Sequence, residues 1–244
     1  MRYGVSYKGS KNGIAKWVVD ALPKAKHFYD LFAGGCAVTH AALLSGKYEL
    51  FYANDIDVAP QLFLDAINGK YRNETRWISR EDFVRLKDSD PYVRYCWSFG
   101  NDGRSYLYSK EIEDYKKALH EAIFFKDYER GKKYGFDFST IDGVEGIHER
   151  RIALRTLVFQ KMTDAGLLEK RGSHSYFKNG AGWQCIEQLQ SLQRLARLER
   201  LQSLESLARL QSLESLESLS RLQSLSVTQK DYREIAIAKD SVIY

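Results

Sequence analysis

Short apolar runs and helix-like spacing alternate through residues 1–70. The run at residues 27–32 (HFYDLF) ends in Ala33-Gly34-Gly35, which is typical of a buried strand that stops at a tight turn. Pro23 closes an amphipathic segment before that run, and Gly46 closes a stretch of helix formers after it. The pattern predicts helices over 14–22, 36–46 and 60–68, and strands over 27–32 and 48–53.

Strands separated by helices of this length predict a parallel, doubly wound sheet, and therefore an α/β fold. A last apolar run at 241–244 (SVIY) suggests that the segment 226–244 returns to this sheet. We expect the strand at 241–244 to lie beside the strand at 27–32 and to be buried on both faces, as parallel strands usually are.

Residues 71–185 follow a different pattern, rich in Tyr, Trp and Arg and in polar loops. The clearest elements there are helices over 110–128 and 147–163. We interpret this segment as a mostly helical insertion into the α/β part, which occupies residues 1–70.

Leucine recurs at every third position through residues 186–225. In an α-helix a three-residue repeat drifts by about 60° per triplet, so the leucine stripe would wind around the axis. The alternative is a solenoid-like stack with one inward leucine per triplet. Because Gly and Pro do not interrupt the run, we favour a helix, with the role of a spacer.

Composition narrows the class of protein further. The chain has 244 residues, 44% of them hydrophobic and 13% aromatic, which excludes disorder for most of it. Cys36, Cys96 and Cys185 lie too far apart for a disulfide framework or a zinc knuckle. The N-terminus lacks the apolar core of a signal peptide, so we expect a soluble, cytoplasmic protein without a membrane partner. A net charge of +5 permits a polyanionic partner without requiring one.

The strongest chemical signal is DLFAGG at residues 30–35. A strand that enters a glycine turn before a helix lets backbone N–H groups approach a ligand closely. Asp55 ends the next strand, where a carboxylate can accept hydrogen bonds from ribose hydroxyls. The alternative is a packing turn, with Asp55 as a helix cap. Ala37 stands where the dinucleotide pattern needs its third glycine, which disfavours NAD.

Two weaker signals lie at the ends of the chain. Lys11 lies two residues after Gly9 and can pair with a carboxylate or phosphate, although a lone lysine is usually solvated. Asp231 and Tyr232 offer an acceptor beside an aromatic face, which suits an adenine; by themselves they also suit a loop Asp and a packing Tyr.

Together, Y-x-G-x-K at 7–11, DLFAGG, NDID at 54–57 and the DY pair before an apolar strand resemble Dam-type N6-adenine-specific DNA methyltransferases. The resemblance covers essentially the whole chain. It implies a Rossmann-like methyltransferase fold, S-adenosylmethionine as cofactor, double-stranded DNA as partner, and DNA methylation of the restriction–modification kind. The residues it assigns to the cofactor are Tyr7, Lys11, Asp30, Phe32, Gly34, Asp55, Asp231 and Tyr232.

The sequence departs from this family at two places. Cys36 stands where many members have a third glycine. In the family a D-P-P-Y motif directly follows a strand like SVIY and holds the target adenine, but these 244 residues contain no DPPY. The resemblance thus implies no catalytic residue within them, and suggests a split or truncated enzyme. We expect a second polypeptide to carry DPPY and to add strands beside 241–244, so that this chain is inactive and not a free monomer.

Six aromatic residues between Tyr92 and Tyr108 are interleaved with arginines, a mixture that suits base stacking and phosphate contact. We predict that Arg94, Arg104 and Tyr106 contact DNA, and that Tyr95, Trp97 and Phe99 form a small core. The five histidines show no metal spacing. The alternative to a methyltransferase polypeptide is a catalytically inactive DNA- or nucleotide-binding remnant of the fold.

Overall fold

The computed structural model describes residues 2–164, 168–171, 174–177, 202–218 and 224–244. The chain divides into two compact units. The sheet unit comprises residues 1–107 and 202–244, and the insert unit comprises residues 108–201. This division reflects compactness, so the functional boundaries expected at 70, 185 and 225 stay predictions.

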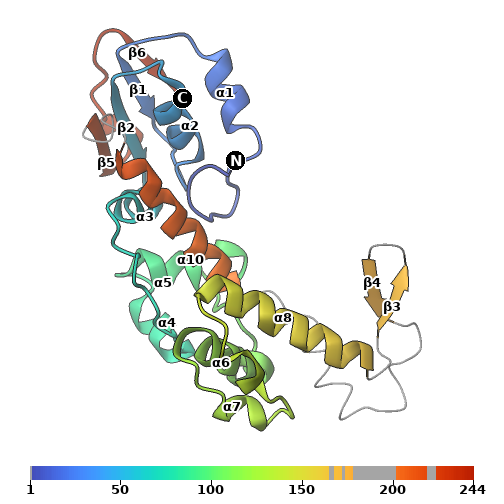
Figure 1. Cartoon of the computed structure of the whole chain (residues 1–244). Coiled ribbons are helices and arrows are strands. Elements are labelled where there is room, and N and C mark those ends of the chain that lie inside the picture. The colour runs from blue at the N-terminus through green and yellow to red at the C-terminus, as the bar shows by residue number, and fades with distance from the viewer. Residues whose placement is uncertain (1, 165–167, 172–173, 178–201, 219–223) are drawn as a thin grey trace. The chain divides into compact units, whose positions relative to one another are not determined.

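A four-stranded parallel sheet forms the centre of the sheet unit, in the order β5-β2-β1-β6. The strands are β1 (His27–Asp30), β2 (Leu50–Asp55), β5 (Leu225–Gln229) and β6 (Ser241–Ile243). In Figure 1 the two red strands from the end of the chain flank the blue β1 and the teal β2. The α/β class and the pairing of residues 241–243 with residues 27–29 are thereby confirmed.

The expectation of full burial for the last strand is wrong. In β6 only Val242 is buried, whereas Ile243 keeps 52% of its surface exposed. The reason is position: β6 pairs with β1 on one side and is an edge strand of the described sheet. The buried core of the sheet lies instead around β1 and β2, where Phe28 and Phe51 are fully buried.

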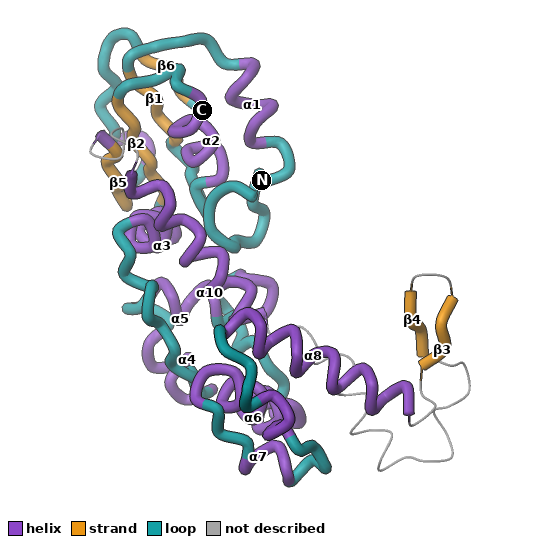
Figure 2. The backbone as a smooth tube through the Cα atoms, viewed as in Figure 1, coloured by secondary structure: helices purple, strands orange, loops and turns teal. Residues whose placement is uncertain are grey.

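Six α-helices of the sheet unit lie in its described residues. They are α1 (Ala15–Ala21), α2 (Ala37–Ser45), α3 (Ala59–Ile67), α4 (Arg80–Leu86), α5 (Pro91–Cys96) and α10 (Gln202–Ser212). The first three match the helices expected from the sequence, with α1 packed on α2, and α3 packed against β2 and β5. Figure 2 shows the parallel strands side by side, with α2 and α3 next to them and α4 and α5 further away.

The helices α4 and α5 have start signals that the sequence analysis did not use. The Ser79 side chain accepts a hydrogen bond from the N–H of Asp82 and caps α4. The Asp90 side chain accepts hydrogen bonds from the N–H groups of Tyr92 and Val93, and Pro91 occupies the first turn of α5.

Residues 202–218 of the leucine repeat are helical and belong to the core of the sheet unit. Leu204, Leu207 and Leu210 lie in α10, and Leu213 and Leu216 lie in the following 3₁₀ helix η3 (Leu213–Ser218); all are at most 5% exposed. A 3₁₀ helix has three residues per turn, so it keeps a triplet stripe on one side. The spacer interpretation did not predict this burial. Residues 186–201 and 219–223 lie outside the described residues.

The described residues of the insert unit form helices and an antiparallel pair of strands. Its elements are α6 (Lys110–Phe125), α7 (Glu129–Lys132), the 3₁₀ helix η2 (Phe138–Ile141), α8 (Ile147–Asp164), and the antiparallel pair β3 (Leu168–Arg171) and β4 (His174–Phe177). Helices α6 and α8 confirm the two predicted from the sequence. Lys116 is buried within α6, over the ring of Tyr108, and burial lowers its pKa to about 7.

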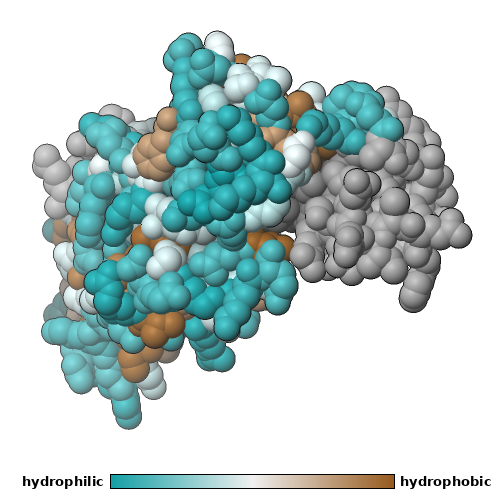
Figure 3. All heavy atoms as spheres, turned by 90° about the horizontal axis from the view of Figure 1, so that it is seen from below, coloured by the Kyte–Doolittle hydropathy of each residue, from teal (hydrophilic) through white to brown (hydrophobic). Residues whose placement is uncertain are grey.

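The surface of the described residues is mostly hydrophilic in the view of Figure 3, with hydrophobic residues in small separate groups. Among the described helices, none combines the length and the apolar character needed to cross a membrane.

Candidate cofactor and DNA site

The turn between β1 and α2 is held by backbone hydrogen bonds, and it leaves no room for side chains at its two glycines. The N–H of Ala33 donates to the carbonyl of Asn54, and the N–H of Val5 donates to that of Gly35. Gly34 has φ +47°, and a Cβ there would lie 3.0 Å from the Tyr7 ring. A Cβ on Gly35 would lie 2.7 Å from Cβ of Tyr7. The two glycines therefore let Tyr7 lie directly against the turn.

Cys36 continues the turn in a conformation that favours glycine. Its φ is +56° and its side chain is fully buried, at the position just before α2. Because non-glycine residues pay for the left-handed conformation, a third glycine would be unstrained at this position. The structure thus accommodates the cysteine, but in a left-handed backbone conformation that is less favourable for cysteine than for glycine.

Asp55 is tied to the same turn. Its Oδ2 accepts a hydrogen bond from the N–H of Gly34 at 2.8 Å, and its Oδ1 accepts one from the N–H of Asp57 at 2.9 Å. Asp55 is therefore not the N-cap of α3, which is Val58. A carboxylate has about four lone-pair sites, so two remain for hydroxyl donors of a ligand.

Asp30, at the end of β1, is 1% exposed. Its Oδ2 accepts a hydrogen bond from Oγ1 of Thr39 at 2.6 Å, whereas its buried Oδ1 has no hydrogen-bond partner. Burial raises the pKa of this carboxyl to about 7, although the Thr39 hydrogen bond opposes the rise. A buried acceptor without a donor is costly, and a bound cation would satisfy it.

These groups line one cavity of about 230 Å³. Six of the eight residues predicted to bind the cofactor lie in its wall: Tyr7, Lys11, Asp30, Phe32, Gly34 and Asp55. The cavity opens at the carboxyl ends of β1, β2 and β6, next to the point where the strand order reverses. Ligands of open α/β sheets bind at this place.

Lys11 places a positive charge in the cavity wall. Its side chain is exposed, and no ion pair or hydrogen bond of its ammonium group appears among the described residues. Tyr244, directly after β6, lines the same cavity. The cavity thus combines one exposed cation, a buried carboxyl group and backbone N–H groups.

The last two predicted cofactor residues, Asp231 and Tyr232, lie outside the cavity wall. The Tyr232 ring is 5.2 Å from that of Phe32, centroid to centroid, which places it at the rim. The Asp231 carboxylate pairs with Arg233. Ile56, which directly follows Asp55, keeps 77% of its surface exposed. The sequence analysis did not name Ile56 as a candidate site residue, although an apolar residue inside the polar motif NDID could have drawn attention to it.

The residues predicted to contact DNA all belong to the sheet unit, and they differ in availability. Arg104 is exposed. Arg94 is 28% exposed and lies 3.7 Å from Asp57 and 3.3 Å from Asp88. Tyr106 is 8% exposed and donates its hydroxyl to the carbonyl of Ile78, so its ring is buried here and its contact with DNA stays a prediction.

The predicted aromatic core is right for two residues and wrong for one. Tyr95 and Trp97 are each 1% exposed, whereas Phe99 is 68% exposed. Phe99 lies beyond the end of α5, outside the core to which Tyr95 and Trp97 belong.

Comparison with protein families now decides the class. Residues 7–169, more than half of the chain, match the family described as D12 class N6 adenine-specific DNA methyltransferases. The chain belongs to this family. The match begins at Tyr7 and includes the glycine turn and Asp55, and the resemblance inferred from the motifs is confirmed. No curated protein matched the chain.

Membership of the D12 class identifies the protein as a methyltransferase family member whose reaction concerns adenine in DNA. The matched segment contains the whole cavity wall except Tyr244, and Asp231 and Tyr232 also lie beyond it. No group of His, Cys, Asp and Glu suited to a metal ion occurs among the described residues.

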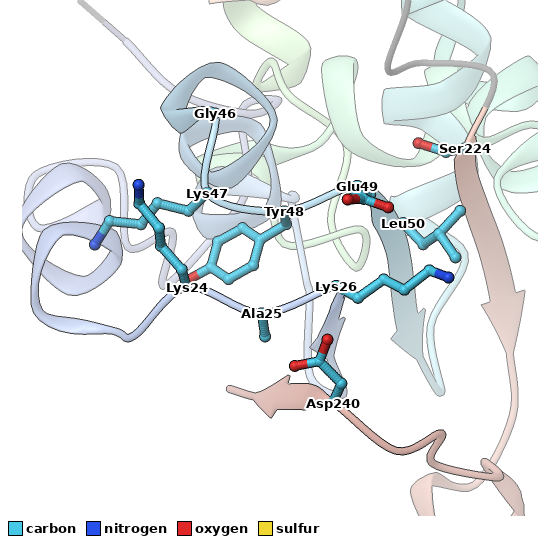
Figure 4. A pocket seen from close by; sticks show the side chains of 10 residues that line it. All are labelled: Lys24, Ala25, Lys26, Gly46, Lys47, Tyr48, Glu49, Leu50, Ser224 and Asp240. Carbon is cyan, nitrogen blue, oxygen red and sulfur yellow. The ribbon is translucent and has the colours of Figure 1, made fainter.

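A second, larger cavity of about 860 Å³ lies at the amino ends of the same strands. Lys24, Lys26 and Lys47 line it together with Glu49 and Asp240. Figure 4 shows the ammonium groups of Lys24 and Lys26 pointing away from each other. The ammonium of Lys47 donates to the last carbonyl groups around α1. These side chains therefore do not converge on a common point in this cavity.

Proposed function

We propose that this chain binds S-adenosylmethionine in the cavity at the glycine turn and takes part in methyl transfer to N6 of adenine in DNA. The observation that carries the proposal is Asp30, whose buried Oδ1 has no hydrogen-bond partner and which lines one cavity together with Lys11 and Asp55. A methionine end carries an ammonium and a carboxylate, which complement Asp30 and Lys11 respectively.

The glycine turn supports the same ligand. A Cβ on Gly35 would collide with Tyr7 and one on Gly34 would press on its ring, so the bare backbone leaves room for Tyr7 in the cavity wall. Asp55 keeps lone pairs for two ribose hydroxyls, and the exposed rings of Phe32 and Tyr232 suit the two-ring base at the rim. When bound, the cofactor supplies an electrophilic methyl group.

Catalysis requires a further segment. The resemblance to the D12 class places a DPPY motif directly after a strand like β6, and Tyr244 at the end of β6 lines the cavity. A segment that continues from Tyr244, or that docks beside it, would therefore start at the cofactor cavity. In our proposal its Asp and Pro carbonyl accept hydrogen bonds from the adenine amino group and raise the electron density on N6. That a second polypeptide carries this segment stays a prediction.

Calorimetry with S-adenosylmethionine tests the cofactor proposal. We expect Lys11→Ala to weaken binding by about 1.5–3 kcal/mol, the range of a charged hydrogen bond. Lys24→Ala, which removes an exposed lysine from the other cavity, is the matched control and should bind as the wild type does. Equal affinities of the wild type and Lys11→Ala would contradict the assignment of Lys11.

Methyl transfer to DNA separates the enzyme from the alternative of an inactive remnant. Labelled methyl incorporation should appear when the DPPY-bearing segment is supplied, fused after Tyr244 or added as a separate chain. A folded protein that binds S-adenosylmethionine and DNA, yet transfers no methyl group in either arrangement, would favour the inactive binding protein.

A further inference from the structure

The segment of residues 3–12, which we call the N-terminal loop, forms one wall of the cavity at the glycine turn. Four of its residues line that cavity: Tyr7, Gly9, Ser10 and Lys11. The N–H of Tyr3 donates to Oδ1 of Asn12 at 2.6 Å, and this bond closes the loop at its base. Because the loop is closed, the position of its base determines where Tyr7 and Lys11 lie.

The base of the N-terminal loop packs directly on the glycine turn. The N–H of Gly4 donates to Nδ1 of His40 in α2 at 3.0 Å, and the N–H of Val5 donates to the carbonyl of Gly35 at 2.8 Å. Gly4 has φ +65°, and a Cβ there would collide with the same carbonyl oxygen. These contacts use the N–H groups of the base, so its carbonyl groups need a donor from elsewhere.

That donor is Arg209 of α10, a helix that passes beside the N-terminal loop (Figure 1). Its Nε donates to the carbonyl of Gly4 at 2.8 Å, and its Nη2 donates to the carbonyl of Tyr3. No carboxylate pairs with this half-buried guanidinium within the part of the chain that the structure describes. Its planar set of donors therefore fixes two neighbouring carbonyl groups of the main chain in one geometry.

The leucine repeat does not itself require an arginine at this position. Each described triplet has a polar residue before its leucine, and the triplets that flank Arg209 have Ser206 and Ser212 there. A serine has one short hydroxyl donor, so it cannot reproduce the two hydrogen bonds of Arg209. The helix α10 also lies beyond the segment 7–169 that matches the D12 class. The contact between Arg209 and the loop is thus a feature of one triplet of this repeat.

We propose that Arg209 is a positioning residue for S-adenosylmethionine, which holds the base of the N-terminal loop on the glycine turn and thereby keeps Tyr7 and Lys11 in the cavity wall. The inference rests on the proposed function, in which Lys11 pairs with the carboxylate of the methionine end. Arg209 does not line the cavity, so it acts through the loop. A wall that is already in place before the ligand arrives lowers the cost of ordering on binding.

Calorimetry with S-adenosylmethionine and the full chain tests this role. Arg209→Met keeps a long side chain and removes both donors. We expect it to weaken binding by about tenfold, at the lower end of the loss of a charged hydrogen bond. Arg209→Lys, which keeps a charged donor, should recover part of the affinity. If Arg209→Met does not fold, Arg209→Gln, which keeps an uncharged donor, takes its place in the same comparison.

Gln211→Met is the matched control on the same helix. The Gln211 amide also donates to two main-chain carbonyl groups, those of Tyr71 at 3.3 Å and Arg72 at 3.0 Å. Neither residue lines the cavity at the glycine turn. Gln211→Met therefore removes a similar attachment of α10 without releasing the N-terminal loop, and it should bind S-adenosylmethionine as the wild type does.

A second comparison separates positioning from general stability. When Lys11 is already replaced by Ala, Arg209→Met should weaken binding by less than it does in the wild-type background, because the released loop no longer carries that contact. An equal loss in both backgrounds, an equal loss in Gln211→Met, or unchanged affinity in Arg209→Met would overturn the role of Arg209. If the wild type does not bind S-adenosylmethionine, the proposed function itself fails, which is a distinguishable result.

Discussion

The backbone N–H of Gly34 donates a hydrogen bond to Oδ2 of Asp55 across 2.8 Å, and this bond joins the turn after β1 to the end of β2. The carboxylate that the sequence predicts as a ribose ligand is thus also a support of the glycine turn. Because the proposed function assigns ligand binding to the same side chain that supports the turn, a variant of Asp55 must be measured for both binding and stability.

Replacing Asp55 with Ala should therefore have two effects. We expect S-adenosylmethionine binding to weaken by about 1.5–3 kcal/mol, because a charged hydrogen-bond acceptor is lost. The free energy of unfolding should fall by about 1–3 kcal/mol, because the Gly34 N–H loses its acceptor. Calorimetry and denaturant titration measure the two effects. Unchanged affinity in a folded Asp55→Ala protein would remove Asp55 from the ribose site.

Asp30 should make cofactor binding depend on pH. Its pKa in the folded protein is about 7, so the carboxyl becomes charged as the pH rises from 6 to 8 and then attracts an ammonium group. We expect S-adenosylmethionine affinity to rise over the lower part of this range. The rise should be absent in Asp30→Asn, which keeps the size of the side chain but not its charge. A pH profile that is the same in both proteins would contradict the assignment.

The same shift has an opposite effect on stability. The folded-state pKa of Asp30 lies above the unfolded value of 3.8, so its contribution is greatest below pH 3.8 and is lost as the pH rises through 7. At pH 8, Asp30→Asn should exceed the wild type in unfolding free energy by up to about 4 kcal/mol, with the difference shrinking toward pH 4. Denaturant titrations at both pH values measure this difference.

His40 should act in the other direction. Its Nδ1 accepts a hydrogen bond from the N–H of Gly4 at 3.0 Å, and burial, together with Arg209, lowers its pKa from 6.5 to about 4. Between these values the unfolded chain binds the proton and the folded protein does not, so stability falls as the pH drops. The loss should reach about 3 kcal/mol relative to His40→Gln, which cannot take up a proton there. Parallel pH-dependent curves for the two proteins would refute this.

Arg104 should contribute to DNA affinity through charge. We expect the exposed Arg104 to contact a phosphate, which is present in every DNA sequence. Arg104→Ala should therefore weaken binding to all duplexes and reduce the slope of log K against log[salt] by about 1. Cofactor affinity should not change. Arg85→Ala, an exposed arginine of α4 paired with Asp82, serves as the control. Wild-type affinity and salt slope in Arg104→Ala would exclude this residue from the interface.

The leucine repeat should behave as a core segment. Leu210 is 1% exposed, and large-to-small substitution of such a residue costs about 2–5 kcal/mol. Leu210→Ala should lose this amount of unfolding free energy, whereas Leu44→Ala, at 38% exposure, should lose less. A loss no greater than that of Leu44→Ala would show that the repeat does not pack in solution as described.

The sequence was most informative where apolar runs and glycine turns coincide. β1 and β2 could be predicted because Phe28 and Phe51 lie in continuous apolar runs, and the run at 27–32 stops at Gly34 and Gly35. The start of β5 was missed because Leu225 has the triplet spacing of the repeat, yet pairs with Phe51 in the sheet. Periodicity cannot distinguish these two environments.

The site residues were predicted by resemblance, and their contacts were not. No sequence pattern shows that Asp30 lies beside Thr39, or that Tyr7 lies against the glycine turn, because these contacts depend on how the elements pack. The exposure of Phe99 and the burial of Tyr106 could not be predicted for a related reason. Both are aromatic residues close together in the chain, and their burial depends on tertiary packing that no sequence pattern shows.

The change from α10 to a 3₁₀ helix at Leu213 determines how the repeat tolerates variation in length. A triplet added within the α-helical part would rotate every later leucine by about 60° away from its contacts. A triplet added within the 3₁₀ part would advance the chain by about 6 Å without rotating the stripe. Gain or loss of a whole triplet near Leu213–Leu216 therefore shifts the later leucines along the helix axis. The same change near Leu204–Leu210 rotates the later leucines about the axis. A sequence of this kind can change its length by copying errors and still present leucine to the core, provided that the copies fall in the tighter helix.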